Sequence, residues 1–343
     1  GDKGIMKKRK LLAAVMAMTI AGTTLLSGCG MNTGATLVNI NNGEDSISLG
    51  YGNFVARYTQ SLYDATYMQY MGTSMWTKEQ DGTTFQDSVK KLVMKSLKED
   101  YLLEQHAADY DVTLSDDEKK SIKKAAKAFM KNNDEDTLEE MTATEEIVEQ
   151  YLTNQTIASK VSNAIKESAD ITVTKEDAAQ RTITYAYIGS VTYKDASGKT
   201  GYYTDDQKKD LKAKAEALTK ATDLKTEGEA AGATIKTTSY GKDDTTLNEA
   251  VIKAADKLSE GEISPVVEVG NDGYYVIRLD SAYDEEATEK AIPTLEEKKR
   301  DEYLKSVLKG WKKEITWTTD KKEWKKVQFD TFFEKVTDAD TTE

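Results

Sequence analysis

Cysteine and histidine, two side chains that often carry nucleophilic, acid–base or metal chemistry, are nearly absent from this chain of 343 residues. There is one cysteine, Cys29, and one histidine, His106. A single cysteine excludes an internal disulfide, a CxxC redox pair and a zinc cluster. A single histidine argues against a Ser-His-Asp set, and no glycine-rich phosphate loop is present. His106 is expected to lie near a helix end and to interact with the helix dipole. We therefore expect no metal site and no cofactor.

Cys29 lies at the end of a predicted secretion signal. Residues 7–10 are basic, and the apolar run over 11–26 is short for a membrane span of about 20 residues. The following Ser27-Gly28-Cys29 completes a tetrapeptide that resembles the lipobox of bacterial lipoproteins. That resemblance implies a signal peptide over 1–28, with Met6 as its start, and a diacylglycerol group on the Cys29 thiol. The protein would then be lipid-anchored at the extracytoplasmic face of the bacterial cell membrane.

The chain as a whole is acidic, with 47 Lys and Arg against 60 Asp and Glu and a net charge of −13. An acidic chain without a basic stripe is a poor nucleic-acid binder, so no nucleic-acid partner is expected. Residues 29–43 are predicted to be the lipidated cysteine and a flexible tether, because Gly, Asn and Thr dominate there. The acidic runs 134–136 and 284–286 lack the ordered alternation of a calcium loop and are expected to be solvated surface.

Helical periodicity over residues 44–173 predicts a helical lobe. One expected apolar face is formed by Phe85, Val89, Leu92, Val93, Leu97 and Tyr101. The patterns at 115–118 and 142–145 are typical of helix starts. Residues 44–173 are therefore assigned to one domain.

Residues 174–289 are predicted to mix strands and helices. Ile183, Tyr185 and Tyr187 alternate with smaller residues, which favours a strand. A capped helix is expected over 204–218 and another over 247–258. Strands are expected over 266–269 and 274–279, joined by a hairpin turn at 270–273. Residues 290–343 are predicted to hold a helix that starts after Pro293 and an aromatic tail that packs on the helical lobe.

Two motifs carry a resemblance to a known family. Residues 261–267 read Gly-Glu-Ile-Ser-Pro-Val-Val, and 273–279 read Gly-Tyr-Tyr-Val-Ile-Arg-Leu. This resembles the end of a parvulin-type (PpiC) peptidyl-prolyl isomerase domain. Gly43-Glu44 followed by Ile47-Ser48-Leu49 is similar to the opening of the helical region of PrsA and SurA foldases. The resemblance implies an α+β fold, in which a SurA-N-like helical chaperone lobe carries an inserted parvulin-like α/β domain with a small sheet flanked by helices.

The sequence departs from this family at the residues that matter for isomerisation. Tyr187 and Tyr275 stand where the family has its two histidines, and Leu247 lies where the family lines its proline pocket. A tyrosine hydroxyl donates and accepts hydrogen bonds but does not reproduce imidazole geometry. Rotation about an X–Pro bond must cross a barrier of roughly 18–20 kcal/mol. The candidate catalytic positions are Tyr187 and Tyr275. Ordinary packing of both rings in the sheet is the main interpretation, and a peptide-contacting role or true catalysis is the alternative.

Two groups of residues are candidate binding surfaces. The peptide-binding candidates in the parvulin-like domain are Tyr187, Tyr240, Leu247, Tyr274 and Tyr275. The client-binding candidates in the helical lobe are Tyr58, Tyr67, Met68, Met71 and Trp76, since pliable methionines and aromatics suit promiscuous binding. For the second group, core packing alone is the favoured interpretation and a partial client-binding surface is the alternative.

These observations predict a membrane-tethered foldase or chaperone that binds newly secreted, unfolded polypeptides, with a degenerate parvulin domain. An active peptidyl-prolyl cis-trans isomerase is the alternative. A purely structural surface lipoprotein is a further alternative, and a homodimer is left open. A two-lobed solute-binding lipoprotein is disfavoured, because residues 48–165 lack repeated strand–helix alternation.

Overall fold

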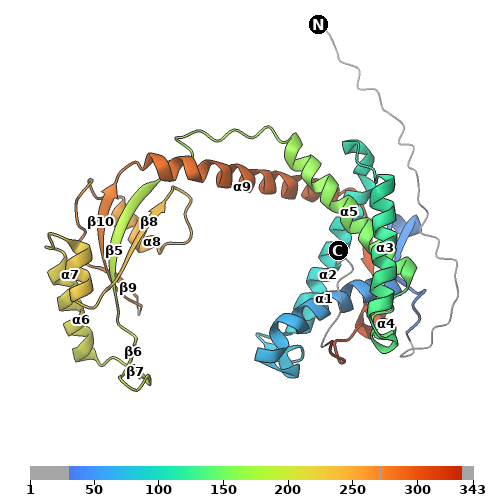
Figure 1. The fold of residues 1–343 in the computed structure, drawn as a ribbon, viewed down its shortest axis with the longest axis horizontal. Coiled ribbons are helices and arrows are strands. Elements are labelled where there is room, and N and C mark those ends of the chain that lie inside the picture. Colours follow the sequence, from blue (N-terminus) through green and yellow to red (C-terminus); the bar gives the residue numbers. More distant parts are fainter. Residues whose placement is uncertain (1–30, 271, 334–343) are drawn as a thin grey trace, which may run out of the picture. The chain divides into compact units, whose positions relative to one another are not determined.

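The computed structural model describes residues 31–270 and 272–333. The predicted signal peptide, lipobox and Cys29 lie outside the described residues. The chain forms two compact units (Figure 1). Unit 1 contains the described residues up to Ala169 and those from Glu302 onward, and unit 2 contains Asp170–Asp301. Within the described ranges, no helix is both long and apolar enough to cross a membrane.

Unit 1 is mainly helical, as the periodicity predicts. Its helices are α1 (Leu49–Met71), α2 (Phe85–Gln105), α3 (Asp116–Asn132), α4 (Glu135–Glu140), α5 (Glu145–Ser168) and α10 (Lys321–Lys326), with short turns η2 (Thr73–Met75) and η3 (Ala107–Tyr110). The predicted capping box of Ser115 and Glu118 is confirmed at the start of α3. At α5 the N-cap is Thr144, whose side chain accepts from the Ile147 amide at 3.1 Å. The acidic run at 134–136 has a structural use, because Asp134 caps α4.

A small antiparallel sheet in unit 1 joins the beginning of the described chain to its end. Its strands are β1 (Thr36–Ile40), β2 (Asp45–Ser48) and β11 (Trp317–Thr319), in the order β11-β1-β2, with the turn η1 (Asn41–Gly43) between β1 and β2. The prediction of a flexible tether over 29–43 is therefore wrong from Thr36 onward. The physical reason is burial, because Leu37, Val38 and Ile40 are fully enclosed in the core. A further two-stranded pair is β3 (Glu79–Gln80) with β4 (Thr83–Thr84).

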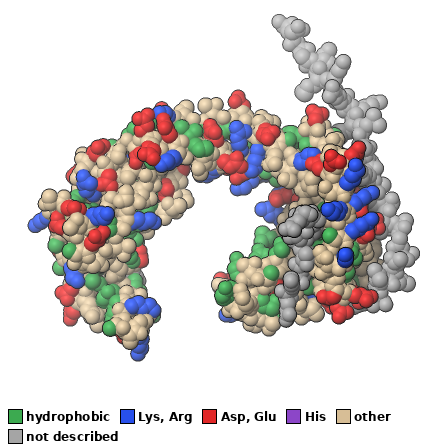
Figure 2. Space-filling model, viewed as in Figure 1, with side chains coloured by type: hydrophobic (Ala, Val, Ile, Leu, Met, Phe, Trp, Pro, Cys, Tyr) green, Lys and Arg blue, Asp and Glu red, His purple; other side chains and the backbone are tan. Residues whose placement is uncertain are grey.

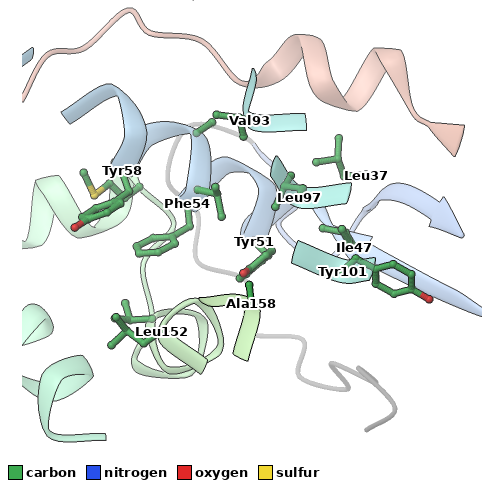
Figure 3. Packing of buried hydrophobic residues seen from close by; sticks show 14 of the residues in the cluster. Leu37, Ile47, Tyr51, Phe54, Tyr58, Val93, Leu97, Tyr101, Leu152 and Ala158 are labelled. Carbon is green, nitrogen blue, oxygen red and sulfur yellow. The ribbon is translucent and has the colours of Figure 1, made fainter. Parts of the chain in front are cut away.

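The core of unit 1 packs α1, α2 and α5 around aromatic side chains (Figure 3). Phe54 of α1 stacks on Tyr58 at 6.0 Å and meets Phe129 of α3 edge-on at 5.9 Å. The aromatic tail packs on this core as predicted: the Phe329 ring lies 4.9 Å from Trp76. Two residues depart from the predicted packing. Leu92, expected on the apolar face of α2, and Phe332, expected to pack with the aromatic tail, are both exposed.

Buried polar groups tie the final described segment to the helices. The ammonium of Lys90 donates to the carbonyls of Trp324 at 2.8 Å and Val327 at 2.6 Å. Burial lowers the pKa of Lys90 to about 8. Arg57 pairs with Glu140 at 3.2 Å, and its guanidinium donates to the carbonyl of Gln328. Both side chains donate hydrogen bonds to backbone carbonyls, and burying those carbonyls without a hydrogen bond would cost free energy.

Unit 2 is an antiparallel sheet with helices on both faces (Figure 1). Its strands are β5 (Arg181–Gly189), β8 (Thr234–Tyr240), β9 (Val267–Val269) and β10 (Gly273–Ser281), in the order β8-β5-β10-β9. Helices α6 (Asp205–Leu218) and α7 (Leu224–Ala230) cover one face, and α8 (Glu249–Ala255) covers the other. A separate hairpin pairs β6 (Thr192–Lys194) with β7 (Thr200–Tyr202). The predicted α+β fold class, with a helical lobe and a parvulin-like domain, is confirmed.

Helix α9 (Glu285–Trp311) corrects a predicted boundary. The sequence favours a helix that starts after Pro293, yet Pro293 lies inside α9. The earlier start is set by Asp284, whose side chain accepts from the Ala287 amide at 2.9 Å. The acidic run at 284–286, expected to be plain surface, thus begins a helix, where negative charge favours the N-terminal dipole.

The packing of the tail predicts unequal effects for two neighbouring phenylalanines. Phe329→Ala should destabilise unit 1 by about 3–5 kcal/mol, because Phe329 is 1% exposed and its removal leaves a cavity against Trp76. Phe332→Ala, at a side chain that is 37% exposed, should cost about 0.5 kcal/mol. Urea unfolding followed by tryptophan fluorescence reports unit 1 alone, because all four tryptophans belong to it. Equal losses for both variants would contradict this packing.

Candidate peptide-binding site

Two tyrosines from neighbouring strands of unit 2 form the centre of the candidate site. Tyr187 of β5 lies directly opposite Tyr275 of β10 in the antiparallel register. Their ring centroids are 4.8 Å apart, and Tyr185 adds a third ring 5.5 Å from that of Tyr275. Side chains alternate between the faces of a strand, so Tyr185 and Tyr187 share the face covered by α8. The structure therefore brings together the two residues predicted to replace the family's histidines.

Asp272, in the turn before β10, holds both tyrosine hydroxyls. Tyr187 donates to Asp272 Oδ1 at 2.9 Å, and Tyr275 donates to Asp272 Oδ2 at 3.3 Å. Partial burial and the neighbouring Asp272 carboxylate raise the pKa of Tyr187 and of Tyr275 to about 12. Both hydroxyls are therefore protonated at neutral pH, with their protons directed at a carboxylate. The sequence pattern places Asp272 in a turn, and nothing local in the sequence indicates this second role.

Two glycines make room for the Tyr187 ring. A Cβ at Gly273 would lie 2.3 Å from the Ile188 carbonyl oxygen and 2.9 Å from the Tyr187 ring. A Cβ at Gly189 would lie 3.2 Å from the Tyr187 hydroxyl. Gly273 and Gly189 are opposite each other in the register, so a larger residue at Gly273 would displace the ring or the strand.

The other predicted peptide-binding residues differ in burial and lie on different faces of the sheet. Leu247 is half-buried and packs against the same cluster as Tyr275. Tyr240 is 2% exposed and donates to Asp256 Oδ1 at 2.7 Å, so the prediction that it contacts a peptide is wrong. Tyr274 is also buried, and it packs with Ile188 on the α6–α7 face. The period of two along β10 places Tyr274 and Tyr275 on opposite faces, which excludes one shared surface.

This arrangement offers an aromatic surface and little acid–base chemistry. Tyrosine rings bury large apolar area against a partner while their hydroxyls stay hydrogen-bonded. With both donors engaged by Asp272, the site presents ring faces and edges rather than a free general acid. In the described part of the chain, no three or more His, Cys, Asp or Glu side chains are placed to hold a metal.

The client-binding candidates of unit 1 also separate by exposure. Tyr58 and Trp76 are buried core residues, so the prediction that they contact clients is wrong, and core packing is the correct interpretation for them. The Trp76 indole donates to Asp64 Oδ1 at 2.7 Å, which satisfies its N–H inside the core. Met68 is half-buried. Tyr67 and Met71 are exposed at the end of α1.

Exposed apolar residues gather along the second half of α1. We call this group the α1 patch, and it consists of Leu62 (50% exposed), Tyr67 (46%), Tyr70 (80%) and Met71 (59%). Figure 2 shows hydrophobic side chains on the surface over the end of this helix. Sequence periodicity alone does not separate the patch from the buried first half of α1, because aromatic residues continue through both halves.

Comparison with known proteins identifies the class of domain in unit 2. Residues 192–299 match the family of the PPIC-type PPIASE domain. The predicted resemblance to a parvulin-type domain is thereby confirmed for this part of the chain. The matched segment includes Tyr275 and Asp272, whereas β5 with Tyr187 precedes it.

Solved structures that match the chain include foldases and a chaperone. The foldase protein PrsA from Lactococcus lactis is 14% identical, with a TM-score of 0.32, over 85% of this chain and 97% of that chain. The peptidylprolyl isomerase PrsA from Bacillus anthracis is 21% identical, with a TM-score of 0.30, over 65% and 96%. A SurA-like chaperone from Campylobacter jejuni is 13% identical, with a TM-score of 0.29, over 84% and 99%. No curated protein matches the chain.

Proposed function

We propose that this protein is a membrane-tethered extracytoplasmic foldase that holds newly secreted, unfolded polypeptides. In this proposal the PPIC-type domain binds peptide segments without catalysing prolyl isomerisation. The match of residues 192–299 to the PPIC-type family supports a foldase role. The α1 patch supports a second contact surface, because clustered exposed apolar groups suit weak binding of many sequences.

One observation carries the proposal that catalysis is lost: both hydroxyls of the tyrosine pair donate to Asp272. An isomerase must stabilise the twisted amide better than the planar one, through hydrogen bonds placed for the transition state. Donors already engaged by a carboxylate must lose that bond before they support a substrate amide. The ring faces of Tyr187 and Tyr275 remain suited to contact a proline ring or an apolar side chain.

An active prolyl isomerase is the second candidate function, and the PPIC-type match favours it. The two candidates differ in one measurable step, the rate of cis–trans interconversion of an X–Pro bond. Uncatalysed interconversion takes tens to hundreds of seconds, so even modest catalysis is detectable.

The first test is therefore a prolyl isomerisation assay. Wild-type protein from Gly30 onward should leave the rate of an X–Pro peptide unchanged, as should Tyr187→Phe and Tyr275→Phe. Tyr202→Phe, at an exposed tyrosine of the β6–β7 hairpin, is the matched control. Acceleration by wild type that is lost in Tyr187→Phe or Tyr275→Phe, but kept in Tyr202→Phe, would establish the enzyme and refute the degenerate site.

The second test addresses the α1 patch by suppression of aggregation of an unfolded client. Wild type should suppress aggregation, and Tyr70→Ser with Met71→Ser should weaken suppression several-fold because apolar contact area is lost. Gln69→Ser is the control, since it changes an exposed position of the same helix without removing apolar area. Wild-type suppression that is unaffected by the double variant would place client binding elsewhere, and no suppression by wild type would favour a purely structural lipoprotein.

The membrane tether in this proposal depends on Cys29. The thiol is the group that would receive the lipid, so Cys29→Ser should abolish incorporation of labelled fatty acid and release the protein from membranes. Two or more acyl chains anchor a protein stably, so wild type should stay membrane-bound. Labelled fatty acid that persists in Cys29→Ser would exclude this cysteine as the anchor.

A further inference from the structure

Unit 1 contains a cavity of about 180 Å³ that the proposed function does not use. It lies between the β1–β2 hairpin, α1, α2 and α5. The residues that line it include Ile47, Tyr51, Leu97, Asp100, Glu104 and Asn154. In Figure 3, Tyr51 extends from α1 toward Ala158 of α5, while Ile47 and Tyr101 lie side by side at the hairpin.

Two carboxylates line this cavity without a cation beside them. Asp100 and Glu104 are four residues apart on α2, so they share one helix face. Among the described residues, neither forms an ion pair with a lysine or arginine, and Asp100 accepts one hydrogen bond from Gln155 at 2.8 Å. The charges that act on them are acidic: Glu99 on Asp100, and Asp45 with Asp100 on Glu104.

The local environment disfavours the ionised carboxylates. Partial burial, with the neighbouring acidic groups, raises the pKa of Asp100 to about 6 and raises the pKa of Glu104. A bound cation would offset this cost, because opposite charge stabilises the ionised form of a partly desolvated carboxylate. Two carboxylates that line the cavity, with no lysine or arginine paired to them among the described residues, indicate a positively charged ligand, and the cavity volume indicates its size.

The remaining lining groups narrow the class of ligand. Hydroxyl and amide groups are supplied by Tyr51 and Asn154, which are joined by a 3.1 Å hydrogen bond. Ile47 and Leu97 form an apolar part of the wall. No lysine, arginine or histidine lines the cavity, so an anionic group on the ligand would have no cationic partner there.

We propose that this cavity binds a primary ammonium group carried on a short alkyl chain. The ammonium would lie at Asp100 and Glu104, and the alkyl chain would contact Ile47 and Leu97. A cavity of about 150 Å³ holds one benzene molecule, so this volume suits a ligand of about five to eight heavy atoms. A metal ion is disfavoured, because the described residues contain no group of three acidic, histidine or cysteine ligands. The ammonium belongs either to a free alkylamine or to a lysine side chain of a bound polypeptide, and only the second source rests on the proposed function.

The test is binding of n-butylamine to the full chain. Butylamine should raise the thermal midpoint of unit 1, followed by tryptophan fluorescence, whereas 1-butanol and ammonium chloride at equal concentration should not. Asp100→Asn and Glu104→Gln should each weaken butylamine binding at least tenfold. Glu146→Gln, which removes one exposed carboxylate from α5, is the matched control and should bind as wild type does.

The two neutralising variants are expected to fold, because each removes a carboxylate whose ionised form is disfavoured in the native state. Their own thermal midpoints check this directly. Equal stabilisation by 1-butanol or by ammonium chloride would overturn the proposal, as would butylamine affinity that survives in both Asp100→Asn and Glu104→Gln. Failure of wild type to bind butylamine at tens of millimolar would overturn it as well.

Competition with a peptide separates the two sources of the ammonium. A Gly-Lys-Gly peptide should displace butylamine if the cavity accepts lysine side chains, and its Nζ-acetylated form should not. Displacement by neither peptide, with butylamine binding retained, assigns the cavity to free alkylamines. That outcome leaves the foldase proposal untouched, because the aggregation assay with the α1 patch variants is a separate measurement.

Discussion

The pairing of β1 with β11 is the constraint on which unit 1 depends, because it joins segments separated by nearly the whole chain. Val38, Asn39 and Ile40 pair with Thr319, Thr318 and Trp317, respectively. β1 is the central strand, so β2 and the start of α1 are positioned against it. The fit is tight: a Cβ at Gly52 would lie within 2.2 Å of Leu37 Cδ2, and Leu37 is fully buried.

The second organising contact is the antiparallel register of β5 and β10 in unit 2. Because Tyr187 and Tyr275 are direct partners, their rings meet without help from any loop. Asp272 then lies one residue before β10, within reach of both hydroxyls. A shift of one residue in this register would turn either tyrosine to the α6–α7 face, where Tyr274 now packs. Strand pairing therefore brings the two tyrosines of the site together. Asp272 accepts hydrogen bonds from both of their neutral hydroxyl groups.

Local signals predicted many elements of the fold correctly. The capping boxes at Ser115 and Thr204 begin helices where expected, because they depend only on residues within one turn. The alternation around Tyr187 predicted a strand for the same reason. Predictions failed where a distant partner decided the outcome. Residues 36–43 have the composition of a tether, but the pairing of β1 with β11 makes them part of a sheet. Pro293 is typical of a helix start, but Asp284 caps the helix nine residues earlier.

The sequence by itself determined the element types, the parvulin-type resemblance and the pair of tyrosines in place of histidines. These features are encoded in short windows, where residue type and spacing act through local geometry. Only the tertiary structure decided which aromatics are surface and which are core. Tyr58 and Tyr70 belong to one helix, yet α3 and α5 cover the first and nothing comparable covers the second among the described residues. Likewise, Asp100 and Glu104 become cavity residues because β1 and β2 close over α2. Burial depends on contacts between distant segments, and no local pattern specifies those.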